Sequence, residues 1–340
     1  MFSIWNNYTM FRQTKRYIDL ICFVGFGLIF SFIFAHLAHS PAIASSSQLI
    51  AQASVEPASG IQVNLFQAIV LGFVQGATEF IPISSTAHLT AIPVLFNWGD
   101  PGVSFIAVIQ LGSVAAVLSY FWSDISQITR GMVKAVRTSD YDSQDFRLAV
   151  GIAVGTIPII ILGLFLKIFE PAFYENTLRS MPSIAIVSIV MALLLAFAES
   201  IGSQKRNFKD LTVKDGIVVG LAQALAIIPG VSRSGSTITA GLFDNLDRAT
   251  AARFSFLLGI PAILISGLVE LRELLTPVGG ESFALLPLIG GLISSAIFSY
   301  LAIAWLLEFL KRRSTWVFVW YRLGFGVFIL VAVALGWIQG

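Results

Sequence analysis

Charged residues and cysteines are both scarce in this chain of 340 residues, and each scarcity excludes a class of protein. Charged side chains make up 12% of the sequence, whereas a soluble domain carries about 25%. Hydrophobic residues make up 56%, and the mean hydropathy is +0.84. The single cysteine, Cys22, excludes an internal disulfide framework and gives no metal site. The composition therefore predicts an integral membrane protein.

Common ligand-binding motifs are also missing from the sequence. It contains no dinucleotide-binding fingerprint, Walker loop, HExxH motif or heptad repeat. Nothing in it points to nucleic acid. Two of the three histidines, His36 and His39, lie near the N-terminus, so His88 is the only histidine in the hydrophobic region that follows.

One stretch, residues 71–89, combines polar chemistry with an apolar context. Its sequence, LGFVQGATEFIPISSTAHL, is interrupted by Pro82, which breaks a helix because proline lacks an N–H and clashes with the preceding turn. Polar groups at membrane depth usually face a cavity or a partner and mark a functional site. A polar loop at the membrane surface is the alternative. The polar residues are Gln75, Thr78, Glu79, Ser84, Ser85, Thr86 and His88.

A partial second copy of this stretch lies at residues 219–239, VGLAQALAIIPGVSRSGSTIT. With an offset of 148 residues, Gln75 aligns with Gln223 and Ser84 with Ser232, whereas the prolines miss by one place. Two broken, serine-rich apolar segments in corresponding halves of a membrane chain point to a buried binding site between them.

The first sixty residues differ from the rest. Basic residues precede an apolar run over 18–35, and a Ser/Ala/Gln-rich stretch follows it to Gly60. The segment 1–60 is interpreted as an uncleaved anchor plus linker or as a signal peptide with a small-residue cleavage site at 42–44. In either case its basic flank is expected in the cytoplasm.

Six further segments have the length and apolarity of membrane spans. The two broken stretches are interpreted as re-entrant hairpins, because non-helical backbone at that depth must be satisfied by protein or water. Glu199, Glu270 and Arg322 fall at span edges and are expected at the membrane interface. The predicted spans are 103–122, 148–169, 183–201, 254–271, 283–307 and 316–338.

Lysine and arginine cluster in the loops at 123–147, 202–215 and 308–315, whereas 170–182 and 272–282 hold one arginine each. The positive-inside rule places the first three loops in the cytoplasm. Three spans separate the two broken stretches, so the hairpins enter from opposite sides. The predicted fold is an all-α, polytopic helix bundle with two re-entrant hairpins in an inverted-topology repeat, whose halves cover about 64–201 and 213–338.

The second broken stretch is dense in hydrogen-bond donors. Glycine at 230 allows close approach of backbone to ligand, and consecutive amides at a helix start form an anion site. Arg233 adds a planar fork that suits phosphate oxygens. The structural alternative is that Arg233 only pairs with Glu79 and ties the two halves together. The candidate phosphate-binding residues here are Ser232, Ser234 and Gly235.

The first broken stretch supplies hydroxyls, a histidine and an acid. Ser84, Ser85 and Thr86 are candidate phosphate ligands or helix caps. Ser85 and His88 are spaced i, i+3 on one helix face, so either could act as nucleophile with the other moving protons. Glu79 is a candidate general base or cation ligand. The residues therefore suggest chemistry on a lipid-linked phosphate, with hydrolysis, transfer and transport all open.

Residues 79–88, EFIPISSTAH, and 229–235, PGVSRSG, resemble the two signature motifs of the undecaprenyl-diphosphatase family of the bacitracin-resistance type. The segment 108–113, VIQLGS, is also similar to that family. The resemblance runs from about residue 64 to the C-terminus, so residues 61–340 are expected to form a membrane-embedded phosphatase domain.

The resemblance implies hydrolysis of undecaprenyl diphosphate to undecaprenyl phosphate and phosphate, which recycles the carrier lipid for cell-wall synthesis and confers bacitracin resistance. It implies a Mg²⁺ or Ca²⁺ requirement, with Glu79 and Gln75 as ligands. Many members have a glutamate where this chain has Gln75, which leaves the affinity or number of cations open. The catalytic residues implied are Glu79, Ser85, His88 and Arg233.

A carrier or flippase for polyprenyl phosphate is the main competing function, because inverted repeats with midplane sites are typical of transporters. The expected location is the bacterial inner membrane, with the site open to the outer face. The expected partners are the lipid substrate and the bilayer, and a homodimer is left open.

Overall fold

The computed structural model describes residues 63–99, 101–275 and 285–338. In these ranges all regular structure is helical apart from one isolated bridge between Arg206 and Leu246. The all-α prediction is confirmed. The N-terminal segment 1–60, predicted as an anchor or signal peptide, lies outside the described residues.

The first half of the bundle begins with the broken stretch and ends before the basic loop at 202–212. It contains a short π-helical turn, Tyr174–Leu178. Its α-helices are α2 (Leu65–Glu79), α3 (Ser85–Leu95), α4 (Val103–Tyr120), α5 (Trp122–Thr138), α6 (Gln144–Phe169), α7 (Pro171–Phe173) and α8 (Met181–Ile201).

The second half follows the same order. Short 3₁₀ turns, Phe208–Asp210 and Leu225–Ile227, flank its first helix. Its α-helices are α9 (Val213–Ala224), α10 (Arg233–Phe243), α11 (Arg248–Leu275), α12 (Leu285–Leu310) and α13 (Trp316–Ala334).

The candidate membrane spans agree with the predicted ones. Five helices, α6, α8, α11, α12 and α13, contain windows long and apolar enough to cross a bilayer. The predicted span at 103–122 falls on α4, which joins α5 through a bend of 65°. This bent pair is a sixth candidate, so the chain is a multi-pass membrane protein.

The two broken stretches have matching backbone geometry. Ser84 caps α3 with φ 76° and ψ 99°, and Ser232 caps α10 with φ 70° and ψ 118°. Each serine Oγ accepts a hydrogen bond from the backbone N–H of the residue three positions further along the chain, which is Ala87 at 3.4 Å and Gly235 at 3.2 Å. A positive φ in a non-glycine residue costs about 1–3 kcal/mol and persists only where its surroundings impose it. The same strain at positions 148 apart supports the internal repeat.

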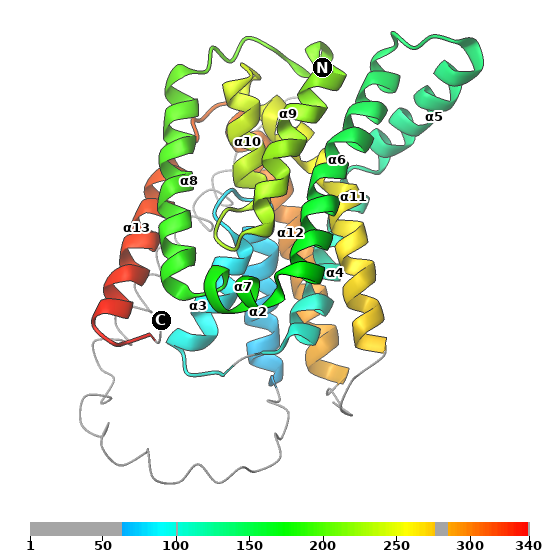
Figure 1. Cartoon of the computed structure of the whole chain (residues 1–340). Coiled ribbons are helices and arrows are strands. Elements are labelled where there is room, and N and C mark those ends of the chain that lie inside the picture. The colour runs from blue at the N-terminus through cyan, green and yellow to red at the C-terminus, as the bar shows by residue number, and fades with distance from the viewer. Residues whose placement is uncertain (1–62, 100, 276–284, 339–340) are drawn as a thin grey trace, which may run out of the picture. The chain divides into compact units, whose positions relative to one another are not determined.

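Helix pairing also follows the repeat. The hairpin helix α2 packs on α12, and its counterpart α9 packs on α6. Two other pairs of counterparts pack on each other, α4 on α11 and α8 on α13. Figure 1 shows α2 and α3 in the lower part of this bundle and α9 and α10 in the upper part. This arrangement agrees with the inverted-topology prediction, while entry of each hairpin into a membrane stays a prediction.

An ion-pair cluster holds the open end of the α9–α10 hairpin. Arg206 donates to Asp215 at the start of α9 and to Asp244 at the end of α10, both at 2.7 Å. Burial opposes ionisation of Asp215, but the hydrogen bonds to this carboxyl, led by those from Arg206 and joined by those from Thr212, together outweigh it and lower its pKa. The cluster therefore ties the end of α10 to the start of α9.

Glycines allow the closest helix contacts. A Cβ on Gly72 would lie 2.3 Å from the Gly291 carbonyl oxygen, and a Cβ on Gly220 would lie 2.3 Å from that of Gly155. These obstacles are backbone atoms, which cannot rotate away. Small residues at such crossings are typical of membrane helix pairs.

Gly220→Ala is expected to destabilise the fold by about 1–3 kcal/mol, because the added methyl group forces α9 and α6 apart. The measurement is the thermal midpoint of purified protein in detergent. Gly324→Ala is the matched control, since a Cβ there meets no atom of the described residues within 4 Å. An equal midpoint for both variants would contradict the close packing of α9 on α6.

Candidate active site

The two hairpin turns touch each other at the centre of the bundle. Ser234, in the first turn of α10, donates through Oγ to the Ile81 carbonyl oxygen at 3.2 Å. The Ser232 and Ser234 hydroxyls lie 3.2 Å apart. Helices α3 and α10 both begin at this contact, and the first amides of a helix have no acceptor in their own helix. The positive ends of two helix dipoles therefore converge on one place, which favours an anion.

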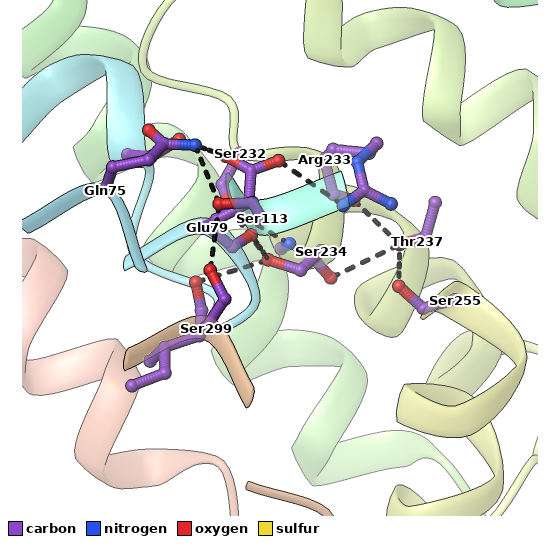
Figure 2. A network of polar contacts seen from close by, with 12 residues as sticks. Gln75, Glu79, Ser113, Ser232, Arg233, Ser234, Thr237, Ser255 and Ser299 are labelled. Carbon is purple, nitrogen blue, oxygen red and sulfur yellow. Dashed lines mark hydrogen bonds and ion pairs between the residues drawn. The ribbon is translucent and has the colours of Figure 1, made fainter. Parts of the chain in front are cut away.

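Glu79, the last residue of α2, is the centre of the polar network in Figure 2. Its Oε2 accepts a hydrogen bond from Ser85 Oγ at 2.7 Å and from Gln75 Nε2 at 3.1 Å. Its Oε1 forms an ion pair with Arg233 Nη2 at 3.5 Å. One carboxylate thus joins a serine from its own half to an arginine from the other half.

A cluster of buried serines supports Gln75 from behind. Gln75 Nε2 also donates to Ser113 Oγ at 3.3 Å. Ser113 in turn lies 3.2 Å from Ser295 Oγ and accepts from Ser299 Oγ at 2.8 Å. The sequence does not predict these contacts of Ser113, because its two partners lie more than 180 residues away on α12.

Arg233 is almost fully buried, with 10% of its side chain exposed. Its ion pair to Glu79 is long, and its Nη1 is buried with no hydrogen-bond partner in the described part of the chain. A buried donor without an acceptor costs about 1–3 kcal/mol, and more on a charged group. The ion pair expected as the structural alternative is therefore present, but it leaves a donor that an anionic ligand can satisfy.

His88 has both ring nitrogens engaged. Nδ1–H donates to the Ser84 carbonyl oxygen at 2.7 Å, and Nε2 lies 2.6 Å from the Tyr321 hydroxyl. The ring also stacks on Phe325, with centroids 4.4 Å apart. The structure does not join His88 to Ser85 by a hydrogen bond, since Ser85 donates to Glu79. The expected Ser85–His88 pair is replaced by a Ser85–Glu79 pair.

The other predicted phosphate ligands divide into three groups. The Ser84 and Ser232 hydroxyls and the Gly235 amide serve the helix caps, which is the alternative expected for serines after a proline. Thr86 is exposed, and its hydroxyl forms no hydrogen bond with the described residues. Ser234 bridges the two turns.

Arg322 of α13 was expected at the membrane interface, and that expectation is wrong. The residue is 1% exposed. Its guanidinium donates to the carbonyl oxygens of Pro82 at 3.3 Å, Val231 at 3.0 Å and Gly230 at 2.6 Å, and its Nε donates to that of Ser188. Arg322 therefore clamps both hairpin turns together.

Glu199 was also expected at the membrane interface, and that expectation is wrong because the residue is buried. It lies near the end of α8 and accepts from Arg248 at the start of α11 and from Thr315 before α13. The side chain of Glu270 lies outside the described residues.

Arg322→Met is expected to lower the stability by about 2–3 kcal/mol, because four buried carbonyl oxygens lose a charged donor. The thermal midpoint in detergent measures the loss. Arg313→Met, which removes an exposed arginine just before α13, should leave the midpoint unchanged. A stable Arg322→Met variant with wild-type midpoint would show that the turns hold together without this clamp.

A divalent cation fits this site only with help from a ligand. The described residues contain no group of three or more His, Cys, Asp or Glu side chains placed to hold a metal. Glu79 supplies one carboxylate, and Gln75 and Ser85 supply neutral oxygen ligands nearby. Mg²⁺ is usually held by one or two carboxylates together with substrate phosphates and water. The donor set therefore suits a cation shared with a phosphate-bearing substrate.

Comparison with known proteins gives one family. The model of the family described as bacitracin resistance protein BacA matches residues 68–328. A curated relative from a Synechocystis species, named undecaprenyl-diphosphatase, is 63% identical over 82% of this chain and 85% of its own length. Relatives with the same name from a Nostoc species and from Synechococcus elongatus are 60% and 58% identical, over 87% and 97% of their lengths.

Proposed function

Because this chain belongs to the family described as bacitracin resistance protein BacA, we propose that its paired hairpin turns hydrolyse undecaprenyl diphosphate. The products are undecaprenyl phosphate and inorganic phosphate. The reaction returns the carrier lipid to cell-wall synthesis and confers resistance to bacitracin, which sequesters the diphosphate. The enzyme is a membrane-embedded hydrolase.

A single observation carries the proposal at the level of residues. The hydroxyl of Ser85 lies 2.7 Å from the carboxylate of Glu79. That carboxylate forms an ion pair with Arg233, whose Nη1 has no hydrogen-bond partner in the described part of the chain. A nucleophile, a base within hydrogen-bond reach and an anion-binding fork therefore share one spot, as phosphoryl transfer requires.

In the first step, Ser85 Oγ attacks the terminal phosphorus of the diphosphate. A bond forms between Oγ and phosphorus, and the bond from phosphorus to the bridging oxygen breaks. Glu79 takes the serine proton and passes it to the departing undecaprenyl phosphate. Arg233 and the first amides of α3 and α10 stabilise the negative charge on the transferring group.

In the second step, water attacks the phosphorus held on Ser85. Glu79 accepts a proton from the water, and Ser85 Oγ leaves with a proton returned to it, so that inorganic phosphate is released. His88 acts as a positioning residue, because its ring holds the Ser84 carbonyl oxygen next to the nucleophile. A Mg²⁺ or Ca²⁺ ion, held by Glu79 with Gln75, would neutralise charge on the diphosphate.

We place the protein in the bacterial inner membrane, with the site open to the outer face. The loops rich in lysine and arginine then lie in the cytoplasm. A homodimer remains an open prediction.

Cysteine labelling tests this orientation. In a Cys22→Ser background, Thr177→Cys is expected to react with a membrane-impermeant thiol reagent in intact cells, whereas Lys209→Cys is not. Both side chains replaced are exposed, so both cysteines should react once the cells are permeabilised. Reaction of both cysteines in intact cells would contradict the predicted inverted arrangement of the two halves.

The test of the function is phosphate release from purified protein given undecaprenyl diphosphate in detergent, with and without EDTA. Detergent has no compartments, so a carrier or flippase releases no phosphate there. Release that EDTA suppresses is the expected result and supports the cation. Folded protein that binds the lipid but releases no phosphate would favour the carrier.

A further inference from the structure

Helix α5 is poorly covered by the rest of the bundle, because Ala135 is its one buried residue. It follows α4 after the bend of 65° at Phe121. Figure 1 shows it beside the first part of α6, with its far end away from the other helices. Near its start, Asp124 pairs with Arg253 of α11, which fixes the rotation of α5 about its axis.

Two kinds of side chain occupy separate arcs of this helix. At about 100° per residue, the exposed apolar residues Trp122, Val133 and Val136 share one arc with Met132. The exposed cations Arg130, Lys134 and Arg137 form the neighbouring arc. The third arc, with Ala135, faces the protein.

The cationic arc borders a groove of about 580 Å³ between α5 and the start of α6. Its lining combines mostly apolar side-chain surface with hydroxyl, amide and cationic groups, and Gln127 donates to Asp145 of α6 across it at 3.2 Å. The lining residues include one acid, Asp145, and two cations, Arg130 and Lys134. The lining residues are Trp122, Ser123, Ser126, Gln127, Arg130, Gly131, Lys134 and Asp145.

We propose that α5 lies along the bilayer surface and binds anionic phospholipid headgroups in its groove with α6. An apolar arc beside a cationic arc is the pattern of helices that lie in the interface, and tryptophan is enriched at that depth. The steep bend after α4 turns the chain away from the direction of a span. A headgroup phosphate meets Arg130 and Lys134, while the apolar arc with Trp122 enters the acyl region.

The test compares hydrogen exchange of residues 122–138 in the full chain, reconstituted in nanodiscs of phosphatidylcholine alone or mixed with phosphatidylglycerol. Each cation close to an anionic surface contributes about fivefold to binding. Phosphatidylglycerol is therefore expected to slow exchange in α5 by roughly tenfold to a hundredfold. The variant Arg130→Gln/Lys134→Gln/Arg137→Gln should lose this protection and keep its phosphate release in detergent.

The variant Lys205→Gln/Lys209→Gln/Lys214→Gln is the matched control. It removes three exposed cations from residues 205–214, outside α5, and should keep the protection of α5. Equal exchange in both lipids would overturn the proposal, as would equal loss of protection in both variants. Protection that appears only with two copies of the chain in one nanodisc would assign the apolar arc to a second copy instead.

Discussion

Replacement of Ser85 by alanine is expected to lower phosphate release by about 10⁴-fold or more, with the fold intact. Ser85 is the first residue of α3, and among the described residues its hydroxyl donates only to Glu79. Its removal leaves the helix cap at Ser84 in place, so the loss is chemical and not structural. The measurement is turnover and thermal midpoint on the same preparation.

Thr90→Ala is the matched control for Ser85→Ala. It removes a hydroxyl from the same helix, where Thr90 Oγ1 donates to the Thr86 carbonyl oxygen within one turn. Its turnover should stay within a few-fold of wild type. A Ser85→Ala protein that releases phosphate at the wild-type rate would exclude Ser85 as the nucleophile and favour direct attack by water.

The second large effect is expected at Arg233. Lysine keeps the charge but not the planar fork, so Arg233→Lys should be impaired as well as Arg233→Ala. The loss of such a contact in a low-dielectric site costs about 2–4 kcal/mol of transition-state stabilisation, or roughly 10²–10³ in rate. Steady-state turnover with undecaprenyl diphosphate measures it.

Stability separates this role from the structural one. If Arg233 served only to pair with Glu79, the double variant Arg233→Ala/Glu79→Ala would be more stable than either single variant, since neither charge is left unpaired. In that case Arg233→Lys would also keep most of its turnover. A folded Arg233→Lys enzyme with near-normal turnover would contradict the phosphate-binding role.

The sequence predicts the parts of this protein that depend on composition and local pattern. Apolar length places the spans, and the broken stretches place both turns, because α2 and α9 have each ended before Pro82 and Pro229. The offset of 148 also pairs Ser84 with Ser232. Both residues have a positive φ, which the sequence pattern does not predict. Serine gives no sequence signal for that conformation.

The parts that the sequence does not predict depend on long-range contacts. Arg322 binds main-chain carbonyl oxygens, which every residue carries, so nothing in the sequence marks its acceptors. His88 meets Tyr321, which lies 233 residues further along the chain. The i, i+3 spacing suggests His88 as the partner of Ser85, but tertiary packing turns the ring away and leaves Glu79 in that place.

The most direct test of the account is to find where the phosphate goes during turnover. Purified enzyme is mixed with undecaprenyl diphosphate, quenched with denaturant within the first turnover, digested and analysed by mass spectrometry. The account predicts a phosphoryl group on Ser85 in the wild-type peptide and none in Ser85→Ala. A phosphoryl group on His88, or rapid turnover with no phosphorylated peptide at any quench time, would contradict the pairing of Ser85 with Glu79 as nucleophile and base.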